Sequence, residues 1–566
     1  MRTSNHPPLS PSPYGRLFRD GHPWIWGARC VTALLLLMVA GIVGIVLVKG
    51  LNTFWPRRLL RVELADGSVV VGEEVKRAVH KVGADSTPQE EIQFRVGNRE
   101  LGGGGGDFRW IAAKDVVKSS EPEDLLSFDR FEYGPAYGRV SEVIEVEGEG
   151  AARVPKVVAK GADALPALRE RIRAAKSRRE ARLKLQMGEG DRLSGEIETL
   201  RIRRARAVTT LEPDDPVLAT RVADLDQRTS RLGEEAQRVA TEVGAIQAED
   251  RRHLVLLEDG TGKPFPAAKP ISGLLRVDEV NRLSFLGRVG LFFARLWRFV
   301  TEDPREANTD GGIWPALYGT MLMTLLMTIF VVPFGVIAAL FLREYAKQGI
   351  VVTAVRIAVN NLAGVPSIVF GVFGLGFFCY LVGGAIDRQF FAELLPSPTF
   401  GGGGILWASL TLSLLTVPVV IVATEEALAA VPKSLREAAI GCGASKWQMI
   451  RRVVLPYASP GILTGMILAM ARGAGEVAPL MLTGVIRKAD NLPLDGVAPY
   501  LHPERRFMHL GFSIYDSGFQ SNNVDASTPL VYSTTLILLL LVLFLNLGAM
   551  LLRNRLRKKF RIGVFG

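Results

Sequence analysis

Residues 314–342 read WPALYGTMLMTLLMTIFVVPFGVIAALFL and contain no charged side chain. About 20 helical residues cross a hydrocarbon layer about 30 Å thick, so this stretch is long enough to span a membrane. The whole chain of 566 residues is 48% hydrophobic and 22% charged, and its mean hydropathy is +0.21. A positive hydropathy at that charge density means that the apolar residues are pooled in segments. This excludes a purely cytosolic enzyme and a disordered scaffold.

Five further stretches have the same apolar character. They cover residues 30–48, 358–383, 405–424, 461–486 and 529–552. The first of them follows a polar tail, residues 1–29, that carries four arginines. A secretory signal peptide has a shorter apolar run nearer to the start of the chain, so we interpret residues 30–48 as an uncleaved anchor. The sequence therefore predicts six transmembrane helices.

Basic residues in the short loops set the orientation of these helices. The tail 1–29, the loop 425–457 and the C-terminal tail 553–566 with its RNRLRKKFR run are all basic, whereas the loop after the fifth span carries both signs. We therefore expect a multi-pass protein of the inner (cytoplasmic) membrane with both termini in the cytoplasm. The net charge of +11 gathers beside the apolar segments, so we expect no nucleic-acid partner.

A long insert, residues 49–312, separates the first two spans and is predicted to be periplasmic. Its part 59–150 is typical of β structure, because residues alternate in polarity around the turn signal Asp66-Gly67. The sequence EEIQFRV places Ile92 and Phe94 on one face of another strand. None of the three cysteines lies in the insert, which excludes a disulfide-stapled domain.

Heptad spacing characterises the next part of the insert, residues 162–256. The sequence EPDDP at 212–216 interrupts the pattern, so we expect two antiparallel helices in a coiled-coil hairpin, either a structural spacer or a docking site. The segment 285–300 has one apolar face interrupted by arginines, and we expect it to lie along the outer membrane surface.

The loop between the fourth and fifth predicted spans contains EAAIGCGASKWQMIRRVVLP, residues 437–456. Its marked positions are Glu437, Ala438, Ala439, Gly443, Leu455 and Pro456. Two short helices broken at the glycine would form a compact knob that a motor subunit can grip. This pattern resembles the coupling loop of the permeases of ABC importers.

The sequences NNLAGVPSIVFGVFGLGFF and PGILTGMILAMARGAGEVAPLMLTG are similar to the PstA family of phosphate-specific ABC permeases. The resemblance covers about residues 301–553 and leaves out the long insert. It implies a mainly α polytopic fold with a permease domain at 313–552. It further implies two separate ABC ATPase subunits, a PstC-like partner permease and a periplasmic phosphate-binding protein. The chain itself is then a transport subunit and not an enzyme, with no cofactor and no metal.

Two charged residues, Arg472 and Glu476, lie one turn apart in the fifth predicted span. Charges within a membrane usually face a protein interior or an aqueous path, and a guanidinium group suits an oxyanion. In the family that the sequence resembles, an arginine and a glutamate of this span are associated with phosphate passage. An ion pair that merely fixes helix packing is the alternative. For the threonine stripe Thr320, Thr324 and Thr328 we expect a packing role.

Two other functions stay open at this point. A permease of the same class could carry sulfate, molybdate or another oxyanion. A membrane-anchored structural or sensory protein, in which the insert is the working part, belongs to a different class.

Overall fold

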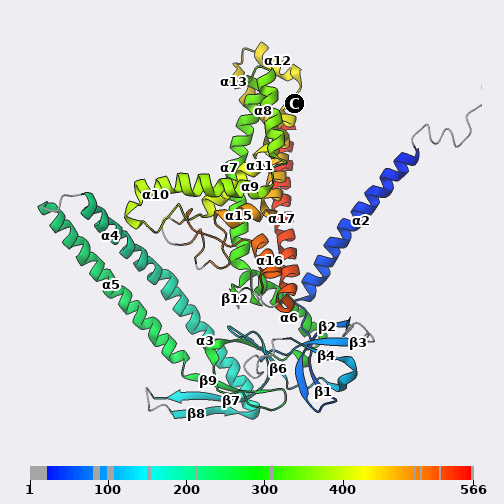
Figure 1. Ribbon diagram of the computed structural model, residues 1–566, viewed down its shortest axis with the longest axis vertical. Coiled ribbons are helices and arrows are strands. Elements are labelled where there is room, and N and C mark those ends of the chain that lie inside the picture. Colours follow the sequence, from blue (N-terminus) through cyan, green and yellow to red (C-terminus); the bar gives the residue numbers. More distant parts are fainter. Residues whose placement is uncertain are drawn as a thin grey trace, which may run out of the picture.

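The computed structural model describes most of the chain, and its helical part dominates the molecule (Figure 1). The residues described are 22–80, 89–98, 108–148, 154–210, 215–305, 308, 310–489, 491–496, 500–521 and 524–561. Residues 1–21 of the predicted N-terminal tail, residues 212–214 of the predicted turn at 212–216 and the last five residues of the predicted C-terminal tail lie outside these ranges.

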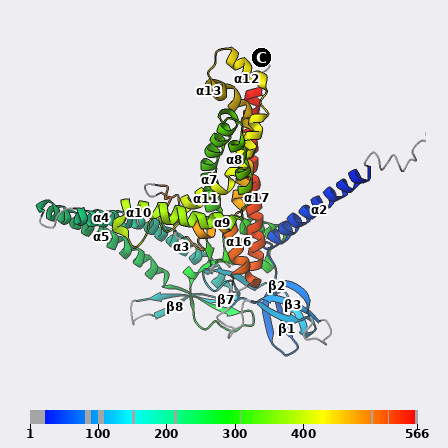
Figure 2. The ribbon, with the colours of Figure 1, turned by 45° about the horizontal axis from the view of Figure 1, so that its top comes forward.

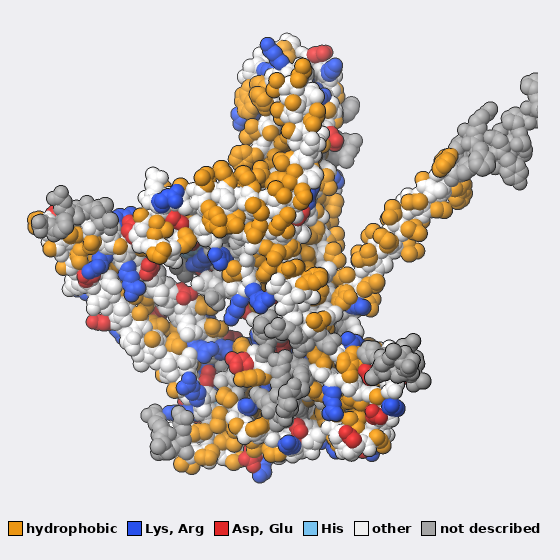
Figure 3. Space-filling model, in the orientation of Figure 1, with side chains coloured by type: hydrophobic (Ala, Val, Ile, Leu, Met, Phe, Trp, Pro, Cys, Tyr) orange, Lys and Arg blue, Asp and Glu red, His pale blue; other side chains and the backbone are white. Residues whose placement is uncertain are grey.

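Within the described residues, six helical stretches are long and apolar enough to cross a membrane, as predicted. They are Trp24–Asn52, Trp314–Tyr345, Ser367–Phe390, Ile405–Ala429, Lys446–Gly475 and Ser527–Arg555. The labelled helices that overlap them are α2 (His22–Asn52), α7 (Trp314–Leu340), α9 (Ser367–Phe373), α10 (Gly384–Phe390), α11 (Ile405–Ala429), α13 (Lys446–Met449), α14 (Leu455–Gly475) and α17 (Val524–Arg561). Figure 3 shows hydrophobic side chains covering this helical region and α2.

Helix α11 lies at the centre of the bundle and packs between α7 and α14. It is the most enclosed of the six stretches, since 67% of its apolar window is buried. Helix α17 packs against α14 on the other side. Helix α2 stands apart from the bundle in both views and touches it only at its lower end, where Ser533 Oγ donates to Gly50 O at 3.1 Å (Figures 1 and 2).

Two antiparallel sheets form the β-rich part of the insert. The first has the order β4-β3-β2-β1-β5. Its strands are β1 (Leu59–Leu64), β2 (Val69–His80), β3 (Gln89–Arg95), β4 (Phe108–Ala112) and β5 (Val116–Ser120). Gly67 has a φ of +80° in the predicted β1–β2 turn, and Ile92 and Phe94 are buried in the sheet's core as the alternation predicts.

The second sheet has the order β10-β9-β7-β6-β11, with β8 paired to β7. Its strands are β6 (Leu126–Arg130), β7 (Ala136–Glu147), β8 (Val154–Lys160), β9 (His253–Asp259), β10 (Lys269–Pro270) and β11 (Leu274–Asp278). Strands β9 to β11 follow the helical hairpin in the chain and were not predicted. They return to the same sheet because Val255 and Leu257 complete a core with Phe128 and Val143.

The hairpin itself is antiparallel, as predicted. Helix α3 (Ala164–Lys184) continues through a π-helical segment into α4 (Asp191–Thr210), and α5 (Pro216–Asp250) returns alongside α4. Both helices contribute buried residues: Leu193, Leu200, Ala207, Leu225 and Val243. Near the tip, Arg206 Nε lies 2.7 Å from Glu393 Oε1, just after α10, so the arm contacts the helical domain (Figure 2).

Helix α6 (Phe285–Thr301) joins the insert to α7 through the short strands β12 (Pro304–Arg305) and β13 (Asp310–Gly311). Its Phe299 ring packs on Phe54 at 5.1 Å between centroids, whereas Phe293 and Trp297 are exposed. The predicted amphipathic character of 285–300 is therefore present. The remaining helices are α8 (Ile350–Leu362), α12 (Lys433–Gly441), α15 (Ala478–Thr483) and α16 (Leu510–Phe519).

Candidate functional site

Helices α12 and α13 form a compact unit at the end of the molecule opposite the insert (Figure 1). We call residues 433–449 the α12–α13 knob. Helix α12 ends in a Schellman motif, in which Ala444 N donates to Ala439 O at 3.1 Å and Gly443 N donates to Ile440 O at 2.8 Å. Gly443 has a φ of +82°, a conformation that side chains with a Cβ disfavour. The glycine of the sequence motif therefore sets the turn between the two helices.

The second helix of the knob starts with a capping box. Gln448 N donates to Ser445 Oγ at 3.3 Å, and Ser445 N donates to Gln448 Oε1 at 2.9 Å. A π-helical segment, Ile450–Val454, then leads into α14. Leu455 and Pro456 lie at the start of α14 and not at the tip of the knob, so the motif's last residues belong to the long helix that follows the knob.

The exposed surface of the knob is partly apolar. Glu437, Ala438 and Gly443 are exposed, whereas Ala439 is half-buried and packs on the core beneath. The side chains of Ile440 and Trp447 are each 55% exposed. Sequence reasoning missed these two residues, although apolar side chains in a predicted polar loop are a usable signal for a contact surface.

Arg436 fastens the knob to the membrane helices. Its guanidinium group donates to Leu428 O, in the last turn of α11, at 2.7 Å. It also donates to Val431 O, just beyond the end of that helix, at 2.6 Å. It also donates to Glu344 Oε1 at 2.9 Å, just after α7. A cation suits this position because the C-terminal carbonyls of a helix carry partial negative charge. No local pattern marks this link, because Glu344 lies far from Arg436 along the chain.

Arg472 and Glu476 lie close together, but not on one helix. Arg472 lies in the last turn of α14, which ends at Gly475, and Glu476 is in extended conformation with ψ of 135°. Arg472 Nε and Glu476 Oε1 are 3.8 Å apart, an ion pair without a hydrogen bond. Both side chains are partly accessible, with 36% and 22% exposed.

The fifth helical stretch therefore ends at Gly475 and not near residue 486. Glycine terminates a helix readily, and Pro479 in the first turn of α15 starts the next one. Gly473 allows α14 and α7 to pack closely, because a Cβ at this position would lie 2.4 Å from Met327 Sδ of α7. The break thus places Glu476 beside a tightly packed helix end.

The threonine stripe of α7 has the packing role that we predicted. The hydroxyl of Thr324 donates to Thr320 O and that of Thr328 to Thr324 O, both at 2.7 Å. Thr320 is fully buried, and its Oγ1 accepts a hydrogen bond from Leu510 N at 2.9 Å. These hydroxyl groups therefore bond back along α7, and Thr320 also joins α7 to the first residue of α16.

Comparison with known proteins identifies the helical region. Residues 331–562 match the family "Binding-protein-dependent transport system inner membrane component". The chain is similar to the phosphate transport system permease protein PstA of Xylella fastidiosa (strain Temecula1), with 31% identity over 46% of this chain and 80% of that protein. PstA 1 of Mycobacterium tuberculosis (strain H37Rv) is 33% identical over 43% of this chain and 70% of its own length.

PstA of Mycobacterium leprae is 37% identical over 35% of this chain. The match covers 60% of the length of this relative, and it also covers 60% of the length of the probable ABC transporter permease protein YqgI of Bacillus subtilis. The matched part is the helical region that carries the knob and Arg472, and the long insert lies outside the family match. The chain therefore belongs to the binding-protein-dependent inner membrane components of ABC transporters, as a PstA-like permease.

Proposed function

We propose that this chain is a permease subunit of an ATP-driven phosphate importer, driven by a separate ATPase that grips the α12–α13 knob. The observation that carries the proposal is the knob itself: a rigid turn that exposes Glu437, Ile440 and Trp447 while Arg436 fastens it to α7 and α11. An exposed apolar pair beside a charge is typical of a protein contact.

The mechanism follows from these contacts. The knob lies in the cytoplasm together with both termini, and the insert lies outside. Two ATPase subunits hold this knob and that of a PstC-like partner permease, and their closure on ATP moves the knobs together. The Arg436 contacts pass that motion to the ends of α7 and α11. The helix break after Gly475 absorbs it beside the charged pair.

Arg472 is the group that suits the cargo. Its guanidinium group is partly accessible and forms no hydrogen bond among the described residues, so its donors are available to an oxyanion. Glu476, at 3.8 Å, holds the guanidinium group near the break and can accept a proton from a partly protonated phosphate. The phosphate relatives favour phosphate over sulfate and molybdate. A soluble periplasmic binding protein would deliver it.

Co-purification tests the ATPase contact. The full chain carrying Ile440→Ala and Trp447→Ala should lose most of the ATPase that purifies with the wild type, because exposed apolar anchors carry much of the free energy of such contacts. Val217→Ala, at a 57% exposed residue of α5, is the matched control and should retain it. Full retention of the ATPase by the double variant would refute the proposed contact.

A further inference from the structure

A cavity of about 250 Å³ lies where the insert meets the membrane helices, far from the knob. Its wall combines strands of both sheets, helix α6, the segment that follows α2, the start of α17, and residues 302, 305, 310 and 311 before α7. The residues Thr53, Phe54 and Trp55 after α2 and Pro529 of α17 belong to it. The cavity therefore opens at the level where the membrane surface meets the folded insert.

Arginine dominates the charge of this wall. Among the described lining residues, six arginines face five carboxylates. The arginines are Arg57, Arg95, Arg276, Arg295, Arg298 and Arg305. Burial raises the pKa of one of the carboxyl groups, Asp310, which reduces the negative charge that the wall carries. The wall thus has an excess of positive charge of the size that one small anion neutralises.

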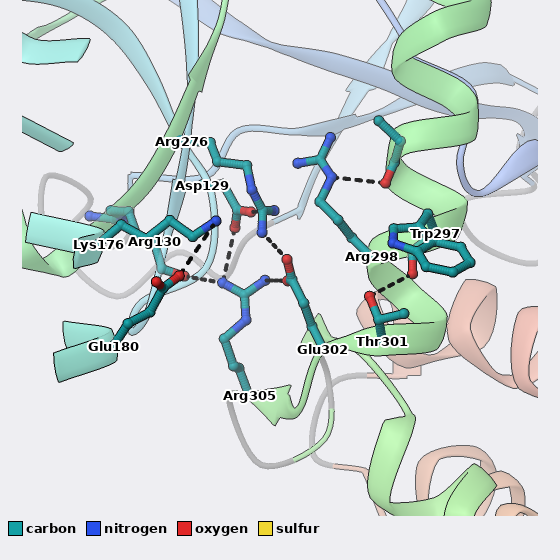
Figure 4. Close-up of polar contacts among 11 residues, drawn as sticks. Asp129, Arg130, Lys176, Glu180, Arg276, Trp297, Arg298, Thr301, Glu302 and Arg305 are labelled. Atoms are coloured by element: carbon teal, nitrogen blue, oxygen red, sulfur yellow. Dashed lines mark hydrogen bonds and ion pairs between the residues drawn. The ribbon is translucent and has the colours of Figure 1, made fainter. Parts of the chain in front are cut away.

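Part of the cluster is an internal lattice (Figure 4). Arg305 Nη1 lies 3.1 Å from Asp129 Oδ1, and Arg276 Nη1 lies 2.8 Å from Asp129 Oδ2. Arg276 also contacts Glu302. This lattice ties strands β6 and β11 to the connection before α7 and leaves Arg305 Nε buried without a hydrogen-bond partner. A buried donor without an acceptor indicates a missing ligand atom or water.

Arg298 contributes a second set of available donors. Among the described residues its side chain makes a single hydrogen bond, from Nε to Ala294 O of its own helix at 2.9 Å (Figure 4). Both of its Nη atoms are therefore unbonded. Burial lowers the pKa of Arg298, and the neighbouring charge of Arg276 lowers it further. Two like charges that approach each other in a partly buried wall are stabilised by an anion between them.

We propose that this cavity binds one phosphate-type oxyanion, held by the unbonded Nη atoms of Arg298 and the unpartnered Nε of Arg305, beside the paired Arg276. Planar guanidinium groups bind phosphate oxygens through strong, charge-assisted hydrogen bonds, and Arg298 and Arg305 offer such donors from two different elements. The ligand is either free inorganic phosphate or the phosphate of an anionic lipid headgroup. Both sources reach a cavity at the membrane surface. Because the wall joins both sheets to α17 and to the segment after α2, the bound anion stabilises the attachment of the insert.

The test uses the full chain in lipid nanodiscs, in an Arg472→Gln background that removes the proposed pathway arginine. One arm titrates radiolabelled inorganic phosphate into discs of phosphatidylcholine alone. The other arm measures phosphatidylglycerol retained from mixed discs by native mass spectrometry. Arg298→Gln should weaken binding in at least one arm by about tenfold or more, because a charged hydrogen bond is lost. Arg298→Lys should restore part of it.

Arg282→Gln is the matched control, since Arg282 of the insert is exposed and pairs with Glu279 outside the cavity. It should bind like its parent. Loss of phosphate binding on Arg298→Gln identifies the free anion, and loss of phosphatidylglycerol alone identifies the lipid. Binding that is absent from the parent in both arms, or unchanged by Arg298→Gln in both, overturns the proposal. Because the background already lacks Arg472, either result leaves the proposed transport function to its own test.

Discussion

Arg436 of α12 and Glu344 after α7 form an ion pair with 2.9 Å between Nη2 and Oε1, and only 19% and 10% of their side chains are exposed. The same guanidinium group binds two carbonyl oxygens at the end of α11. One side chain therefore joins the knob to two membrane helices, which is the connection that the proposed ATPase would need in order to move them.

Removing that connection should uncouple the knob. We expect Arg436→Gln to lower the free energy of unfolding by about 1–3 kcal/mol, because it leaves the carboxylate of Glu344 and the helix carbonyls without their donor. ATP hydrolysis in the complex should continue while uptake per ATP falls. Thermal unfolding and the ratio of uptake to hydrolysis measure the two effects. Arg451→Gln, at an exposed arginine nearby, is the control, and equal behaviour of both variants would contradict the role of Arg436.

The turn of the knob should respond to backbone chemistry alone. A Cβ at Gly443 would meet no atom within 4 Å, so Gly443→Val should act through the positive φ, at a cost of about 1–2 kcal/mol. We expect faster amide exchange from Ala439 to Gln448 and weaker ATPase retention. Gly441→Ala provides the contrast, because Gly441 has equal space and lies at the end of α12 without a positive φ. If both variants exchange alike, strain at Gly443 does not shape the knob.

The second sheet should lose stability in acid. Burial, followed by the charges of Arg171 and Arg178, lowers the pKa of His253, and Glu145 and Glu249 oppose that shift only in part. Arg171 Nη1 lies 2.6 Å from His253 Nδ1, so the ring must accept there and be neutral. The unfolded chain then binds more protons below a pH of about 6.5, and stability that is complete above this pH falls as the pH decreases.

Amide exchange of β9 at pH 7.5 and 5.5 measures this effect. We expect protection to fall in the wild type at pH 5.5 and the difference to shrink in His253→Gln, which cannot take up the proton. The hairpin seam around Leu200 and Leu225 serves as an internal reference. An equal loss of β9 protection in both proteins would assign the acid sensitivity to other groups.

Local sequence signals predicted the parts of the fold that local chemistry decides. Apolar composition gave the six helical stretches, and Gly443 with Ser445 and Gln448 encodes the caps of the knob within a few residues. Contacts between distant segments were not predictable in this way. The return of β9 to the sheet of β7, and the pairing of Arg436 with Glu344, depend on tertiary packing that no short pattern records.

The charged pair shows the same limit within one segment. The spacing of Arg472 and Glu476 correctly predicted that their side chains lie close together. The prediction assumed that both residues lie on one continuous helix, which is wrong because α14 ends at Gly475. Gly475 and Pro479 carried the signal for the break, and the apolar composition around them outweighed it. The geometry at the pair is therefore that of a helix end, where an extended residue faces the last turn.

Uptake of radiolabelled phosphate by vesicles that contain the purified complex tests the central claim most directly. We predict ATP-dependent uptake that sulfate and molybdate do not compete away, a loss of about tenfold or more in Arg472→Gln, and normal uptake in Arg451→Gln. Phosphate uptake that persists without ATP, that is unchanged by Arg472→Gln, or that excess sulfate abolishes would contradict it.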